Sequence, residues 1–264
     1  MTAGLATDLT TGTGLRIRRL SARFGAEVSG VTLSGRLSGG LVEDLKDALF
    51  EHKVLTFRGQ HLTTAQHAGL LDRFGPVSAP DLRAPDHGEW VATDSFRLSP
   101  PKIVSFRPSG PVPPGATAWF ADAAGAYRDL PRPLRSLADS ARALHGPIGG
   151  HDVVAHPVTR LHPETGDRTL LLGTYARRVV GLDDTESRTV LRLLRTHLDL
   201  PGNVLRWSWR TGDVLLVDAR AVFFRRPGVG EGVGEGETAE PVVRLTVAGD
   251  RPLGVDGQHS RPAA

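Results

Sequence analysis

The chain has 264 residues, of which 39% are hydrophobic and 23% charged, and this composition predicts a globular protein built as one large domain. It contains no cysteine, which excludes disulfides, thiolate metal sites and cysteine nucleophiles. The formal net charge is +3, but lysine occurs only at positions 46, 53 and 102 and the arginines are scattered among acidic residues, so we expect no nucleic-acid partner.

The beginning of the chain predicts a flexible segment over residues 1–14. It is rich in Thr, Gly and Ala, and it lacks the basic start and the long apolar core of a secretory signal. No later apolar run approaches the length of a membrane-spanning helix. We therefore expect a cytoplasmic protein with no membrane partner.

The first elements alternate between strand and helix. Apolar and polar side chains alternate over residues 15–20, which predicts a short strand, and residues 40–51 carry apolar side chains at helical spacing. Residues 54–57 form a compact apolar strand. A capping box at Thr63 and Gln66 then predicts a helix that runs to about residue 73.

The central part predicts many short strands with two brief helices between them, which is typical of a double-sheet jelly roll. The expected strands are 102–106, 117–120, 141–145, 153–160 and 169–172, and the expected helices are 123–127 and 134–140.

Acidic residues at 183–186 predict the first turn of a helix that continues to residue 197. Closing strands follow at 204–210, 214–218 and 242–248. A Gly/Glu tract over 228–238 predicts a mobile loop, which is either a lid over a pocket or a surface loop exposed to solvent. We expect one domain over 15–250, of α+β class with a double-stranded β-helix core and flanking helices, and a flexible tail over 251–264.

Several runs in chain order carry a family resemblance. Residues 90–96 read Trp-Val-Ala-Thr-Asp-Ser-Phe and precede Pro100-Pro101; the other runs are 54–60, 115–122, 156–166, 217–225 and 244–250. Together they resemble the Fe(II)/2-oxoglutarate dioxygenases of the taurine dioxygenase type, the TauD/TfdA family. The resemblance implies the jelly-roll fold and a small organic acid as substrate.

The resemblance also implies where metal ligands would lie. The family reads His-x-Asp-x-x-Phe in the first stretch and Trp-Asp-Asn-Arg-x-x-x-His-Arg in the second. We interpret Ala92 as the first histidine position, Asp94 as the carboxylate and Phe224 as the second histidine position. A site for Fe(II) needs two imidazoles and one carboxylate, so the sequence predicts no metal and no 2-oxoglutarate cofactor.

Two residues match the family's 2-oxoglutarate contacts. Arg244 stands at the place of the arginine that grips the distal carboxylate, and Thr117 stands at the place of the threonine that assists it. A guanidinium suits a carboxylate because its planar fork donates two parallel hydrogen bonds. Glu240 replaces a second family arginine, and pairing of Arg244 with a nearby acid is the alternative interpretation.

Asp94 is the candidate catalytic residue. Without a metal, this carboxylate either pairs with a cation or stays protonated as a general acid or base. Arg225 and Arg226 are the cations expected to reach it and to contribute to substrate binding. His87 and His151 are the histidines that could rebuild a metal site elsewhere.

Three functions remain open. The first is a redox-neutral, metal-independent enzyme that acts on a small carboxylate-bearing molecule of specialised metabolism by acid–base chemistry at Asp94. The second is a non-catalytic relative that binds a small molecule or a protein. The third is an Fe(II)/2-oxoglutarate oxygenase with displaced metal ligands. The relatives also make a homo-oligomer possible.

Overall fold

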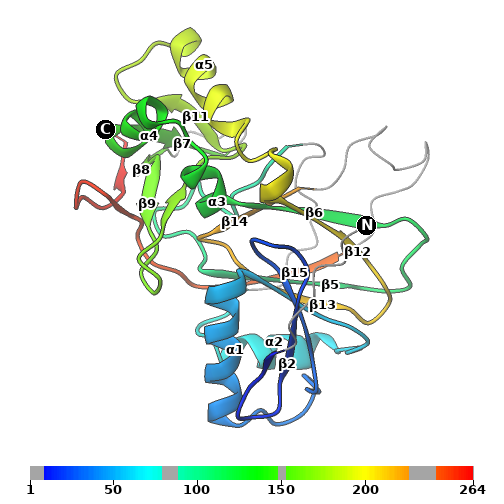
Figure 1. Ribbon diagram of the computed structural model, residues 1–264. Helices are drawn as coiled ribbons and strands as arrows, with labels where there is room; N and C mark the ends of the chain where they lie inside the picture. The colour runs from blue at the N-terminus through cyan, green and yellow to red at the C-terminus, as the bar shows by residue number, and fades with distance from the viewer. Residues whose placement is uncertain (1–8, 79–88, 148–152, 226–241, 264) are drawn as a thin grey trace.

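A seven-stranded sheet runs through the computed structural model, which describes residues 9–78, 89–147, 153–225 and 242–263 (Figure 1). Its strands pair antiparallel except for one parallel pair, β3 with β4. The spatial order is β1 (Leu9–Thr10), β2 (Arg16–Arg19), β3 (Ala26–Ser29), β4 (Val54–Phe57), β13 (Val214–Asp218), β5 (Ile103–Pro108) and β15 (Val242–Val247).

The central strands of this sheet are apolar on both faces because both faces are covered. In β13 the side chains of Val214 and Leu216 pack on one side of the sheet, and those of Leu215 and Val217 pack on the other. Alternation along a strand sends successive side chains to opposite faces. A continuous apolar run is therefore the pattern expected for a strand between two layers.

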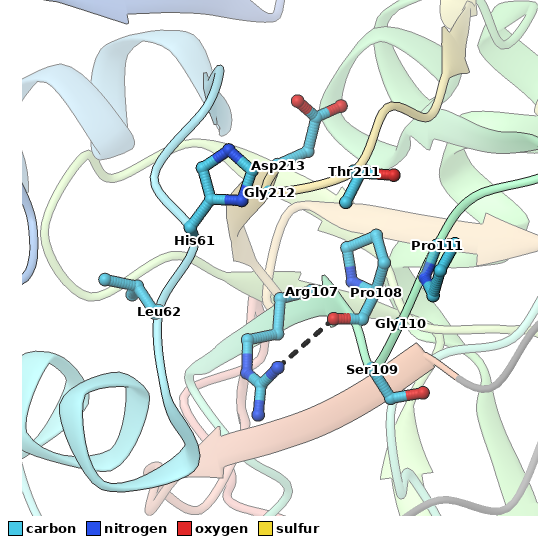
Figure 2. Close-up of a pocket in the computed structure, with 10 residues that line it drawn as sticks. All are labelled: His61, Leu62, Arg107, Pro108, Ser109, Gly110, Pro111, Thr211, Gly212 and Asp213. Carbon is cyan, nitrogen blue, oxygen red and sulfur yellow. Dashed lines mark hydrogen bonds between the residues drawn. The ribbon is translucent and has the colours of Figure 1, made fainter.

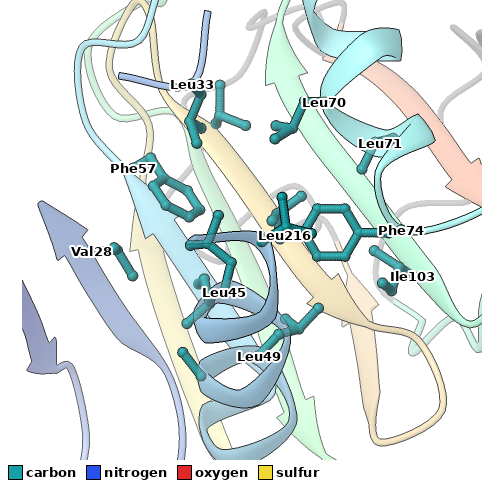
Figure 3. Packing of buried hydrophobic residues seen from close by; sticks show 14 of the residues in the cluster. Val28, Leu33, Leu45, Leu49, Phe57, Leu70, Leu71, Phe74, Ile103 and Leu216 are labelled. Carbon is teal, nitrogen blue, oxygen red and sulfur yellow. The ribbon is translucent and has the colours of Figure 1, made fainter. Parts of the chain in front are cut away.

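Helices α1 (Gly39–His52) and α2 (Thr64–Asp72) cover the outer face (Figure 3). Leu45 and Leu49 of α1 pack against Phe57 and Leu216 of the sheet. The predicted capping box of α2 is confirmed: Thr63 accepts from the backbone of Gln66, and the Gln66 side chain accepts from the backbone of Thr63.

A second, three-stranded sheet lies against the inner face and closes the jelly roll. Its order is β12 (Val204–Ser208), β6 (Thr117–Asp122) and β14 (Val222–Arg225). Phe120 and Phe224 of this sheet pack with Phe106 and Leu215 of the first one. The predicted α+β jelly-roll class is confirmed, and the aromatic core between the sheets is where the family motifs meet.

The remaining elements form a flanking layer around a third apolar cluster. The strands are β7 (Arg142–His145), β8 (Val154–Pro157), β9 (Thr159–Leu161), β10 (Arg168–Leu170), β11 (Ala176–Val179), β16 (Leu253–Gly254) and β17 (Arg261–Pro262). The helices are α3 (Ala123–Arg128), α4 (Arg132–Ser140), α5 (Asp184–Arg195) and the 3-10 turn η1 (Pro201–Asn203). Among the described helices, none has the length and apolarity needed to cross a membrane.

Both ends of the described chain differ from the expected flexible segments. Leu9–Thr10 pairs with β2, so the paired structure begins before residue 15. At the other end β16 pairs with β9, β17 pairs with β8, and Ser260 is fully buried with its hydroxyl bonded to His156. The polar composition of residues 251–264 predicts a flexible tail, but the pairing of β16 and β17 with distant strands orders this segment. The Gly/Glu tract at 228–238 lies outside the described residues.

Three buried histidines should make the fold sensitive to acid. Burial lowers the pKa of His67 to about 3 and that of His156 to about 4, and burial also lowers the pKa of His145 well below its ordinary value. The unfolded chain, with histidine pKa values near 6.5, then binds more protons as the pH falls below that value. We expect the unfolding free energy to drop by about 1.4 kcal/mol per pH unit for each neutral histidine between roughly pH 6 and pH 4.5.

Urea titrations at several pH values measure this dependence. His67→Gln should flatten the slope because it removes one such group, whereas His259→Gln, at an exposed position, should leave it unchanged. A pH-independent unfolding free energy over this range would contradict the expectation.

Candidate functional site

The two motif stretches lie side by side, with Val91 directly opposite Phe224. The backbone N–H of Val91 donates to the carbonyl of Phe224 at 2.8 Å, and that of Phe224 donates back at 3.2 Å. Both side chains enter the aromatic core between the sheets, whereas the Ala92 methyl packs with Trp90 in the flanking layer. The assignment of Ala92 as the first histidine position is therefore wrong by one residue.

The family spacing supports this correction. Counted back from Phe96, the order His-x-Asp-x-x-Phe places the histidine at Val91 and the carboxylate at Thr93, not at Asp94. The Thr93 hydroxyl is buried and has no hydrogen-bond partner among the described residues. The sequence contains the signal for this assignment, because the distance from Phe96 fixes which residues occupy the histidine and carboxylate positions of the motif. The presence of an aspartate at position 94 favoured the other assignment.

Asp94 forms an ion pair with Arg244. Arg244, on β15, donates from Nη1 to Oδ1 of Asp94 at 3.2 Å, and Nε of the exposed Arg97 lies 3.6 Å from Oδ2. The side chains of Asp94 and Arg244 are 9% and 14% exposed, so the pair is almost completely buried. The cation that Asp94 was expected to acquire is thus Arg244 of β15, and the alternative interpretation of Arg244, pairing with a nearby acid, is the contact that the structure has.

Arg225 lies elsewhere in the site. Its guanidinium carbon is 4.6 Å from the ring centroid of Trp90 and 4.4 Å from that of Trp119, and Nη1 is 3.8 Å from Asp199. This stacking between two rings is a favourable cation–π arrangement. The hypothesis that Arg225 is the partner of Asp94 is not supported by these contacts. Arg226, Glu240, His87 and His151 lie outside the described residues.

A wall of aromatic rings stands beside this pair. The rings of Phe224 and Phe106 meet edge to face with centroids 5.0 Å apart, and Phe120 lies 6.4 Å from Phe106. Apolar surroundings lower the local dielectric constant and so strengthen the attraction between Asp94 and Arg244. The ring of Phe224 is therefore part of the core between the sheets.

A buried hydrogen-bond network fixes the turn that carries Asp94. Asp94 has a φ of 47°, which is the left-handed region that aspartate tolerates better than most residues. Next to it, the Ser95 hydroxyl lies 3.0 Å from Nδ1 of His145, and the Ser95 carbonyl accepts from Nε2 of His156 at 2.8 Å. Because burial keeps both imidazoles neutral, they position the turn without adding charge. Sequence reasoning had set these two histidines aside.

Thr117 lies at the start of β6, where it pairs with Ser208 of β12. It is half-buried. Among the described contacts, no hydrogen bond joins Thr117 to Asp94 or Arg244. Its role in substrate binding stays a prediction.

Comparison with known proteins confirms the resemblance. Residues 16–232 match the family model described as taurine catabolism dioxygenase TauD, TfdA family. The chain is 32% identical to an alkylsulfatase of Acinetobacter baylyi, over 92% of this chain and 88% of the relative. It is 33% identical to an alpha-ketoglutarate-dependent sulfate ester dioxygenase of Pseudomonas putida, over 94% of each chain. A taurine dioxygenase structure from Burkholderia xenovorans superposes with a TM-score of 0.85 and 30% identity, covering 95% of this chain and 96% of that one.

These relatives correct one expectation. The sequence predicted no cofactor and doubted Fe(II) and 2-oxoglutarate, but the matching family is one of dioxygenases and the Pseudomonas putida relative is alpha-ketoglutarate-dependent by name. The expectation that the protein has no cofactor is therefore contradicted, and a related structure was solved with Mn(II) and N-oxalylglycine. The residues at the motif positions give a separate result. The side chains of Val91 and Phe224 carry no lone pair that could bind a metal, and the hydroxyl of Thr93 is a weak metal ligand. This ligand set does not fit a facial triad, and no group of three metal-ligating side chains occurs within the described ranges.

Rebuilding the ligand set tests the corrected register. We expect the variant Val91→His, Thr93→Asp, Phe224→His to bind Mn(II) at least tenfold more tightly than the wild type in a calorimetric titration, because the two imidazoles then face each other across paired strands. The matched control is Ala92→His with Phe224→His, which retains Asp94 but sends one imidazole into the flanking layer. Equal or tighter Mn(II) binding by the control would contradict the register.

Proposed function

The chain belongs to the taurine catabolism dioxygenase TauD, TfdA family, and we propose that within it this protein binds a small organic anion at Arg244 and moves a proton with Asp94. The observation that carries the proposal is the 3.2 Å ion pair between these two side chains, which are 150 positions apart in the chain. This pair supports the proposal, because it brings a guanidinium and a carboxylate to one place.

The pair supplies both parts of a proton-transfer reaction. A carboxylate or sulfate on the ligand competes with Asp94 for the guanidinium of Arg244, which binds oxyanions through its planar fork. Asp94 is then released next to the bound molecule. Its carboxylate takes a proton from a carbon or oxygen adjacent to the anionic group and returns it to another atom of the same molecule. Such an isomerisation needs no electron acceptor, because the proton and the bonding electrons are only rearranged within the same molecule.

The relatives indicate which anions to consider. Two of them are named for alkyl sulfate or sulfate ester chemistry, and one of these uses alpha-ketoglutarate. A small molecule that bears a carboxylate or a sulfate therefore fits both the relatives and the chemistry of Arg244. 2-Oxoglutarate is the first probe, because it is the cofactor of this family and carries a carboxylate at each end.

A second function is supported by the aromatic core. The Phe224 ring packs at 5.0 Å from Phe106, so the place of a family metal ligand is occupied by a well-packed apolar side chain. A protein that binds a small anion at Arg244 without transforming it would keep the same contacts. Binding and turnover must therefore be measured separately.

Calorimetric titration with 2-oxoglutarate tests binding. We expect the wild type to bind and Arg244→Gln to lose at least tenfold in affinity, since it loses a charge-assisted contact. Arg97→Gln is the matched control, because Arg97 also faces Asp94 but is 61% exposed in its side chain. Undiminished binding by Arg244→Gln, or no binding by the wild type, would overturn the proposed anion site.

Hydrogen exchange of the same ligand separates the two functions. In D2O, nuclear magnetic resonance follows deuterium entry at the carbon beside the 2-oxo group, which requires a base. We expect the wild type to accelerate this exchange and Asp94→Asn to be slower by roughly a hundredfold, the lower range for general-base catalysis. Binding without accelerated exchange would support the second function and contradict the first.

A further inference from the structure

A cavity of about 280 Å³ lies beside the end of β5 (Figure 2). Arg244 is paired with Phe106, whose ring enters the core between the sheets, so the Asp94–Arg244 pair lies on the opposite face of the large sheet from Arg107. Phe106 of β5 enters the core between the sheets, so its neighbour Arg107 points outward, towards α2. The cavity is lined by the loop that precedes α2, the end of β5 and the turn before β13. Its polar side chains are His61, Arg107, Ser109, Thr211 and Asp213.

Arg107 is a buried cation that has no carboxylate partner among the residues that the structure describes. Its residue surface is 9% exposed. Nη2 donates to the Thr64 hydroxyl at 2.9 Å and Nη1 to the Pro108 carbonyl at 3.1 Å, while Nε is buried and has no acceptor. Both acceptors are neutral. Since a guanidinium carries five N–H donors, three remain after these two bonds.

The other buried arginines are neutralised, which makes Arg107 different. Arg160 donates to Asp250 at 2.8 Å, and Arg220 lies 2.7 Å from Glu164. Burial lowers the pKa of Arg107, and no acidic group offsets that effect. An unpaired buried charge is costly unless a counter-ion reaches it.

The neighbouring charges leave this cation available to an anion. Asp213 lines the cavity, and its Oδ2 already accepts from Arg58 at 2.5 Å and from the backbone of Arg210 at 2.9 Å. Its Oδ1 is buried and has no hydrogen-bond partner among the described residues, but the ion pair with Arg58 offsets the charge of this carboxylate. His67 of α2, which is buried against the sheet, is held neutral because burial and the charge of Arg107 lower its pKa to about 3. The positive charge of Arg107 is therefore not balanced from within the described cavity wall.

The start of α2 adds to the positive potential. The bond from Arg107 to Thr64 places the guanidinium at the first turn of this nine-residue helix, where the helix dipole favours negative charge. Across the cavity, the His61 ring lies against Gly212. A Cβ atom at position 212 would lie only 2.6 Å from the imidazole. Glycine thus lets the ring stand at the cavity wall (Figure 2).

We propose that this cavity binds a small oxyanion, such as sulfate, phosphate or the carboxylate group of a small acid, with Arg107 as its anchor. The ligand supplies the counter-charge that the protein does not. This site is separate from the Asp94–Arg244 pair and does not depend on the function proposed for it.

Titration calorimetry at constant ionic strength tests the site, with sodium sulfate, sodium phosphate and sodium succinate as probes and sodium chloride as the reference. We expect at least one oxyanion to bind the wild type, and Arg107→Gln to weaken it at least tenfold. The same comparison is made in proteins that carry Arg244→Gln, because the Asp94–Arg244 pair is itself proposed to bind oxyanions and would add to the measured heat. The oxyanion should still bind in that background, and Arg107→Gln should still weaken it at least tenfold. The strongest of the three probes identifies the class of anion.

A second variant keeps the test decisive if Arg107→Gln does not fold. At Gly110, on the cavity rim, a Cβ would meet no atom within 4 Å, so Gly110→Glu fits and adds a negative charge. It should weaken oxyanion binding at least tenfold, whereas Gly110→Gln should not. In the Arg244→Gln background, no oxyanion binding, or binding that Arg107→Gln and Gly110→Glu leave undiminished, would overturn the proposal.

Discussion

The ion pair between Asp94 and Arg244 joins the two parts of the protein on which the site depends. Arg244 belongs to β15, at the edge of the large sheet, while Asp94 belongs to a turn that the flanking layer fixes through His145 and His156. A charge-assisted hydrogen bond in apolar surroundings is strong only if both groups are held in place. The neutral imidazoles behind Ser95 and the ladder of β15 provide this support from opposite sides.

The aromatic core explains why the pair has formed at this place. Phe224, Phe106 and Phe120 fill the space between the two sheets with apolar rings. A carboxylate in such surroundings needs a cation, and Arg244 of β15 supplies it. The side chains that fill this interior, and not the fold alone, determine the chemistry.

Much of the fold could be predicted from local pattern, because helix caps and apolar periodicity are short-range signals. Thr63 with Gln66 and Asp183 with Glu186 both form the capping boxes that their spacing indicates. Strand β14 was not predicted, since Val222, Phe223 and Phe224 are all apolar and show no alternation. The ordered end of the chain was missed for a different reason: its pairing with β8 and β9 is a long-range contact.

The candidate site shows the limit of motif matching. Along a strand, an error of one residue moves a side chain to the opposite face. The sequence assignment chose Ala92, but the strand pairing shows that Val91 faces Phe224. The partner of Asp94 could not be chosen from sequence either, because Arg225 is as plausible as Arg244 until the rings of Trp90 and Trp119 are seen to hold it. The sequence contains no signal for an anion site at Arg107, since the absence of a carboxylate partner among the described residues becomes visible only in the folded chain.

The coupling between Asp94 and Arg244 is the quantity that tests this account most directly. Urea unfolding of the wild type, Asp94→Asn, Arg244→Gln and the double variant forms a double-mutant cycle, which isolates the interaction of the two side chains from their other contacts. We predict a favourable coupling energy above about 1 kcal/mol. A coupling energy indistinguishable from zero would contradict the account, because the ion pair would then not hold the site together.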